Sequence, residues 1–125
     1  MKHGRYVDNL NIIRWFCDGL LHRDNGLAFE SCCKKEWYKN GQLHRLDGPA
    51  VEWKDGTKEW YKNGTLHRED GPAIEVPFSK TENEYFLNGF HYLKYEYEYL
   101  MSKRKLNEKL QTTLEEKKSI TRNKI

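Results

Sequence analysis

The chain has 125 residues, enough for one domain, with a mean hydropathy of −1.00, 33% charged residues and 14% aromatic residues. This aromatic content excludes a disordered chain, because disordered segments are poor in aromatic residues, and no apolar run approaches membrane-spanning length. Residues 1–100 carry 14 Lys and Arg against 16 Asp and Glu, whereas residues 101–125 carry 8 against 3. The near-neutral body excludes a uniformly basic nucleic-acid binder.

Four copies of one motif follow one another along the chain. They read RWFCDGLLHRDNGLAFE from Arg14, EWYKNGQLHRLDGPAVE from Glu36, EWYKNGTLHREDGPAIE from Glu59 and a shortened EYFLNGFHY from Glu84. Their starts lie 22, 23 and 25 residues apart. Self-similarity at such a period indicates a repeat architecture, in which each unit buries its apolar face against its neighbours.

Strong turn signals lie within each copy and also between the second and third copies. The dipeptides tolerate the positive φ angles of tight hairpin turns, and they are Asp18-Gly19, Asn40-Gly41, Asp55-Gly56, Asn63-Gly64 and Asn88-Gly89. The short runs between them, such as residues 50–54 and 57–62, alternate aromatic or β-branched residues with polar ones, as strands do. We therefore expect a mainly β fold: an antiparallel β-hairpin repeat sheet of three to four repeats, over residues 1–92.

From about Leu93 the apolar residues follow helical spacing, which predicts a C-terminal helix in a basic second segment, residues 93–125. The apolar positions form two groups, Leu93, Tyr97, Leu100 and Met101, then Leu106, Leu110 and Leu114. At 100° per residue these groups lie roughly 180° apart on one helix. Either the helix kinks near residues 103–105, or its halves face different neighbours. We expect the first half to cap the last repeat and the second to face another chain, for example in a homodimer.

The segment Tyr61–His67 (YKNGTLH) resembles the aromatic-x-x-Gly-x-x-His core of MORN repeats, which form antiparallel hairpin arrays. Arg68 departs from that pattern, because a glycine usually follows the histidine and here the next one is Gly71. The longer pattern W-Y-x-N-G-x-L-H-R-x-D-G-P-A is similar to MORN-like repeats abundant in proteins of phages, giant viruses and AT-rich bacteria. The resemblance covers roughly residues 14–100.

This resemblance implies an interaction scaffold of viral or prophage origin. Small phage proteins that block host defences, anti-CRISPR proteins among them, have a suitable length. By that analogy the partner would be a host protein, such as a CRISPR effector or another defence protein, which the chain would inhibit by covering its surface in the host cytoplasm.

A polar ladder recurs at the repeat spacing: His22, Arg23 and Asp24, then His44, Arg45 and Asp47, then His67, Arg68 and Asp70. One interpretation is a series of histidines that bind a metal or of arginines that bind phosphate. The other is structural, with Arg and Asp paired across a loop and His in a fixed polar niche. We favour the structural interpretation, because metal ligands must converge and equivalent residues of successive repeats are spread along the array.

Two aromatic rows are the first candidates for partner binding: Trp15, Trp37, Trp60 and Tyr85, and beside them Phe16, Tyr38, Tyr61 and Phe86. Neighbouring strand residues face opposite sides, so one row should be core and the other exposed. An exposed row that contains Tyr38, Tyr61 and Phe86 beside Lys39 and Lys62 has the composition of an interface hot spot. It could also stack the bases of a single-stranded nucleic acid. The alternative is that both rows are structural.

The helix supplies the remaining candidates. Tyr95, Glu96, Tyr97 and Glu98 form an acidic, aromatic run that suits a basic protein surface. Lys103, Arg104 and Lys105 begin a basic run that suits nucleic acid or an anionic membrane, or else is the solvated face of the helix.

Nothing in the chain indicates catalysis. No nucleophile elbow, phosphate loop or paired-carboxylate pattern stands out, and the glutamates that open each repeat, Glu36 and Glu59 among them, read as solvated strand residues.

Cys17, Cys32 and Cys33 lack C-x-x-C spacing, which argues against a disulfide framework and favours a reducing, cytoplasmic location. A zinc site formed by Cys32, Cys33 and a histidine is possible, but the spacing of these residues in the sequence is poor for one. The sequence thus predicts a non-enzymatic protein-binding module without metal or cofactor; the alternative is a nucleic-acid-binding protein that uses the basic helix and an aromatic row.

Overall fold

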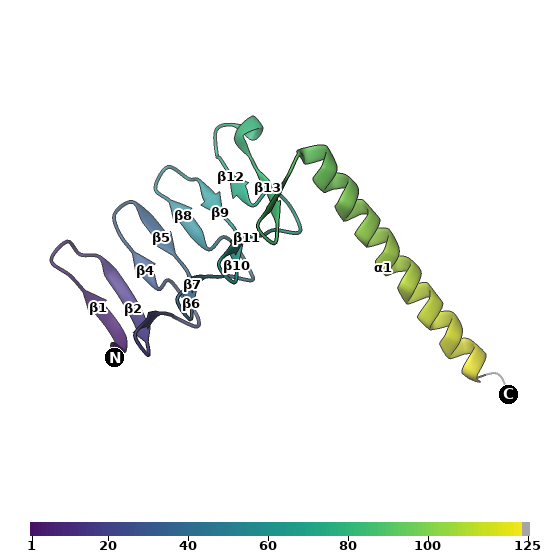
Figure 1. Cartoon of the computed structure of the whole chain (residues 1–125), viewed down its shortest axis with the longest axis horizontal. Coiled ribbons are helices and arrows are strands. Elements are labelled where there is room, and N and C mark those ends of the chain that lie inside the picture. Colours follow the sequence, from purple (N-terminus) through teal and green to yellow (C-terminus); the bar gives the residue numbers. More distant parts are fainter. Residues whose placement is uncertain (124–125) are drawn as a thin grey trace. The chain divides into compact units, whose positions relative to one another are not determined.

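A computed structural model describes residues 1–123 of the chain (Figure 1). The predicted fold class is confirmed, since antiparallel strands joined as hairpins precede a single C-terminal helix among these residues. The chain divides into two compact units, with the boundary after Tyr92.

The main sheet has eight strands, each antiparallel to its neighbours. Its order is β1-β2-β4-β5-β8-β9-β12, and β3 pairs with β2. The strands are β1 (Gly4–Val7), β2 (Ile13–Cys17), β3 (Leu20–Leu21), β4 (Phe29–Glu30), β5 (Lys34–Glu36), β8 (Val51–Trp53), β9 (Lys58–Glu59) and β12 (Ile74–Glu75).

Three two-stranded hairpins form a second row below the strands of the main sheet in Figure 1. They are β6 (Tyr38–Lys39) with β7 (Gln42–Leu43), β10 (Tyr61–Lys62) with β11 (Thr65–Leu66), and β13 (Tyr85–Leu87) with β14 (Phe90–Tyr92). The Asn of each turn has φ 50°, and the following Gly has φ 80–82°. Both angles are positive, as a two-residue turn between twisted strands requires, so the local sequence determines these turns.

In the second repeat a tryptophan connects a strand of the main sheet to the hairpin that follows it. β5 ends at Glu36 and β6 begins at Tyr38, with Trp37 between them. The Trp37 amide donates to the Ala50 carbonyl at 2.7 Å, and its carbonyl accepts the His44 amide at 3.1 Å. Ala50 is completely buried, as are its counterparts Ala28 and Ala73. The completely buried side chains at these positions are therefore small, and the core there is thin.

The last connection and the helix complete the chain. A short 3-10 helix, η1 (Lys80–Glu82), lies between β12 and β13. The helix α1 (Lys94–Asn123) is uninterrupted and Figure 1 shows it straight, so of the two alternatives for its apolar positions the kink does not occur. Neither helix in the described part of the chain combines the length and the apolar character needed to cross a membrane.

Candidate functional site

Each arginine of the polar ladder lies over the tryptophan of its own repeat. The guanidinium carbon of Arg45 is 4.0 Å from the centre of the Trp37 ring, its Nε donates to Asp47 at 3.0 Å, and its Nη1 donates to the Pro49 carbonyl at 3.1 Å. A planar guanidinium can stack and donate at the same time. The same stacking holds Arg23 on Trp15 at 4.1 Å and Arg68 on Trp60 at 3.7 Å.

The glycine of each ladder loop leaves room for the stacked arginine. A Cβ atom at Gly48 would lie 3.0 Å from the guanidinium carbon of Arg45, and one at Gly71 would lie 3.0 Å from that of Arg68. Gly26 stands in the same relation to Arg23, at 3.1 Å. A side chain at any of these glycines would force the arginine to shift, so glycine favours the stacked arrangement.

Each histidine of the ladder joins its repeat to the next. His44 Nδ1 accepts a hydrogen bond from the backbone N–H of Asn63 at 3.0 Å. In the neighbouring repeats His22 Nδ1 accepts from the backbone N–H of Asn40 and His67 Nδ1 from that of Asn88, both at 2.9 Å. An acceptor Nδ1 requires a neutral ring with its proton on Nε2. Burial, followed by the nearby Lys39 and Lys62 charges, lowers the pKa of His44 and thus favours that form.

Two equivalent grooves lie between successive loops of the ladder. One, of about 430 Å³, is lined by Arg23, Asp24, Trp37, Lys39 and Asp47 among others. The second, of about 600 Å³, lies one repeat further along and is lined by the corresponding Arg45, Asp47, Trp60, Lys62 and Asp70. Leu46 lines both grooves and is 79% exposed. The fold thus brings the predicted Lys39 and Lys62 together with the ladder residues.

Neither aromatic row is exposed, so the expectation that one row faces solvent is wrong. Tyr38 and Tyr61 are half-buried, and their hydroxyls donate to Glu36 at 3.0 Å and to Glu59 at 3.1 Å. Burial first, and then these carboxylates, raise the pKa of each tyrosine to about 12. Phe86 is half-buried too, beside the ring of His91. Arginines thus cover the three tryptophans of one row, and glutamates hold the two tyrosines of the other.

Glu36 is not the solvated strand residue that the sequence suggested. It is only 5% exposed, and besides the Tyr38 hydroxyl it contacts the Lys34 ammonium at 3.2 Å. A buried carboxylate needs such partners to offset its lost hydration. Glu36 is therefore a buried residue that the two side chains beside it in its own strand region hold in place.

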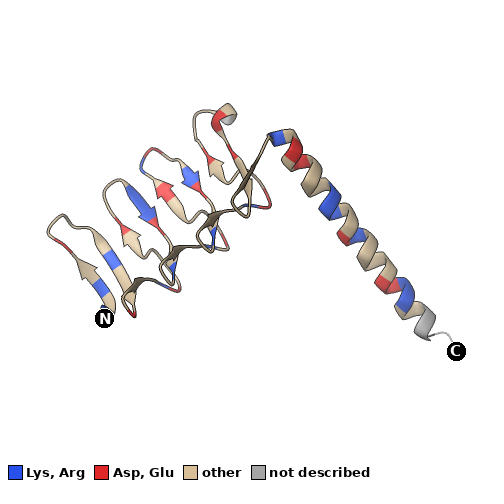
Figure 2. Ribbon diagram, in the orientation of Figure 1, with Lys and Arg blue, Asp and Glu red and all other residues tan. Residues whose placement is uncertain are grey.

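The helix candidates have different environments. Tyr95 is 70% exposed, and Glu98 and the basic run Lys103, Arg104 and Lys105 are exposed as well. Tyr97 is buried, and Glu96 accepts the Leu93 amide at 3.0 Å, which is one half of a capping box. Figure 2 shows the basic positions spread along α1 with acidic ones between them. Glu96 and Tyr97 are thus engaged within the chain, whereas Tyr95 and Glu98 present exposed side chains at the start of α1.

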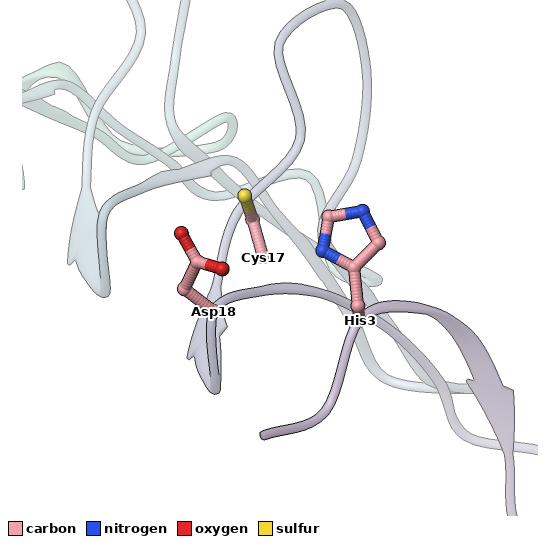
Figure 3. Close-up of side chains that lie close together, drawn as sticks. All are labelled: His3, Cys17 and Asp18. Atoms are coloured by element: carbon pink, nitrogen blue, oxygen red, sulfur yellow. The ribbon is translucent and has the colours of Figure 1, made fainter.

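The sequence interpretation missed a cluster of metal-ligating side chains at the N-terminal end of the array. His3, Cys17 and Asp18 place one ligand atom each within 4.8 Å of the others (Figure 3). The signal that could have revealed it is the pair Cys17-Asp18, which stands where the next copies have Lys39-Asn40 and Lys62-Asn63. His3 precedes the repeats, so the spacing of the motif gave no indication of it.

Comparison with known protein families, with curated proteins and with solved structures gives no match for this chain.

Proposed function

We propose that the chain is a non-enzymatic protein-binding module and that the two inter-repeat grooves form its binding surface. The observation that supports this most directly is the recurrence of one groove, lined by equivalent residues, one repeat apart. Two adjacent copies of the same chemistry suit a macromolecule that contacts both of them. A small substrate would need a single convergent site.

The groove residues have the chemistry of a protein interface. The Asp47 and Asp70 side chains are 81% and 86% exposed although each accepts from an arginine, so their remaining lone pairs are open to donors of a partner. Lys39 and Lys62 supply opposite charge from the hairpins, and Leu46 offers an apolar contact between the two grooves. A central apolar residue within a polar rim is typical of protein interfaces.

The resemblance to MORN-like repeats of phages and viruses extends this proposal. On that basis the partner is a host protein, such as a CRISPR effector or another defence protein, and the bound module inhibits it by covering its surface in the host cytoplasm. Exposed residues of α1, including Tyr95 and Glu98, provide a second contact or a seam between two copies.

The test is affinity capture of the tagged chain from host-cell lysate after nuclease treatment, with identification of bound proteins by mass spectrometry. We expect one abundant protein that the double variant Leu46→Asp, Lys62→Glu fails to retain. A matched control is Leu10→Asp, since Leu10 is 75% exposed in the turn between β1 and β2 and lies outside the grooves. Circular dichroism should show the same fold for all variants.

The experiment also tests the alternative. The excess of positive charge in residues 101–125 favours nucleic acid as a second candidate partner. Bound material that nuclease removes, and that the triple variant Lys103→Glu, Arg104→Glu, Lys105→Glu no longer retains, would contradict the groove proposal and support nucleic-acid binding.

A further inference from the structure

His3, Cys17 and Asp18 come from two segments that the fold brings together. His3 directly precedes β1, Cys17 ends β2, and Asp18 begins the turn into β3. The Gly19 amide donates to the Lys2 carbonyl at 2.8 Å, so the backbone holds the two segments side by side. Figure 3 shows the three side chains on the same side of the ribbon. Their convergence thus follows from backbone pairing of β1 with the first hairpin.

The three ligand types are those that zinc-class cations prefer. Imidazole nitrogen, thiolate sulfur and carboxylate oxygen bind Zn²⁺ at roughly 2.0–2.3 Å, which places tetrahedral ligands about 3.5 Å apart. The ligand atoms here lie within 4.8 Å of one another, so movements of about 1 Å would complete the coordination. His3 and Asp18 are exposed and Cys17 is half-buried, which leaves their side chains room for such movements. Among the residues that the structure describes, no other group of three His, Cys, Asp or Glu side chains meets in this way.

Comparison with the other repeats shows that the fold of the hairpin does not depend on the residue types at Cys17 and Asp18. At the positions of Cys17 and Asp18 the two best-conserved copies have lysine and asparagine, as Lys39-Asn40 and Lys62-Asn63. Asp18 adopts the same φ of 50° as Asn40 and Asn63, so asparagine would serve the turn equally well. The fold therefore does not require a thiol and a carboxylate here, and both occur in the one hairpin that lies beside His3.

We propose that His3, Cys17 and Asp18 bind one divalent zinc-class cation, with a water molecule as the fourth ligand. The thiol proton passes to the solvent as the thiolate binds. The ion links the segment before β1 to the first hairpin and so fixes the N-terminal end of the array. This site is independent of the grooves that we propose for partner binding.

The proposal is tested with the full-length chain, stripped of metal and titrated with Co²⁺ and then Zn²⁺. Thiolate-bound Co²⁺ has a charge-transfer absorption band, which Zn²⁺ abolishes by displacement. We expect one ion per chain, a band that is lost in Cys17→Ser, and a Zn²⁺ affinity reduced at least about tenfold in Asp18→Asn and in His3→Ala. Zn²⁺ should also raise the melting temperature of the unmodified chain, because the ion binds the folded state.

Two further variants test whether the band comes from Cys17 and whether the first hairpin folds without the ligand residues. Cys32→Ser, Cys33→Ser removes the exposed adjacent thiols, whose sulfur atoms are 3.3 Å apart, and must leave the band intact. Cys17→Lys, Asp18→Asn gives the first hairpin the residues of its neighbours, and must fold without binding the ion. A band that persists in Cys17→Ser and vanishes in the Cys32, Cys33 variant would overturn the proposal, as would the absence of saturable binding.

Discussion

His44 connects two repeats through a ring nitrogen that must carry no proton. Its pKa lies below the ordinary value of 6.5, mainly because of burial and then because of Lys39 and Lys62. As the pH falls, the unfolded chain therefore takes up this proton before the folded chain does. The stability that depends on neutral His44 is present above pH 6.5, the ordinary pKa of His44 in the unfolded chain. It is lost as the pH falls from there through the lower pKa that His44 has in the folded chain.

The first prediction concerns this titration. In urea unfolding followed by tryptophan fluorescence, the midpoint should fall as the pH is lowered from about 7.5 to about 5. His44→Gln should show a shallower fall, because the amide oxygen can accept from Asn63 but does not titrate in this range. Equal pH slopes for the two proteins would contradict the assigned role.

Arg45 supplies a prediction about packing. Arg45→Lys keeps the positive charge but loses the planar stacking on Trp37 and one of the two donors that reach Asp47 and Pro49. We expect a loss of about 1–3 kcal/mol in the free energy of unfolding, measured by urea denaturation. The control is Arg5→Lys on the exposed strand β1, which should change stability little.

At the scale of the element, the start of α1 depends on Glu96. Its carboxylate accepts the Leu93 amide, one of the donors at the helix start that have no partner within the helix. Glu96→Ala should cost about 0.5–1 kcal/mol locally and speed amide hydrogen exchange in the first turn. Glu98→Ala, at an exposed position two residues further on, is the control. Equal effects of the two substitutions would show that Glu96 does not cap the helix.

The hairpins could be predicted from sequence because their signal is local. Asn40-Gly41 and its counterparts specify positive φ angles whatever surrounds them. Exposure could not be predicted in the same way, since period-2 alternation places Trp37 and Tyr38 on opposite sides but does not reveal what covers each side. The arginine that covers Trp37 comes from a loop eight residues later, and Glu36 holds the Tyr38 hydroxyl. The grooves and the His3 cluster likewise depend on contacts between segments, which motif spacing does not encode.

At the scale of the whole molecule, the repeats are close to interchangeable. β5 lies between β4 and β8, and β9 lies between β8 and β12. Deleting residues 36–58 joins Lys35 to Glu59 and recreates the Lys-Glu pair that begins each of these repeats. Because each unit contacts only its neighbours, the array should close over the missing unit.

We therefore predict that the chain without residues 36–58 retains its β-sheet signal in circular dichroism and unfolds cooperatively at a lower urea concentration. The control is deletion of residues 36–46, which removes about half a unit and leaves a strand without its matching hairpin. That protein should lose the signal. A similar loss in both deletions would show that the array is not built from independent units.

The bonds between successive repeats also have a consequence for synthesis. His22, His44 and His67 reach residues only 18, 19 and 21 positions later in the chain. Contacts over such short separations need little loop closure and form quickly. During translation each unit can dock on the one before it soon after it leaves the ribosome, without waiting for the C-terminus. A nascent chain of this protein therefore buries its aromatic residues progressively, and at no stage has to keep a complete unfolded array in solution.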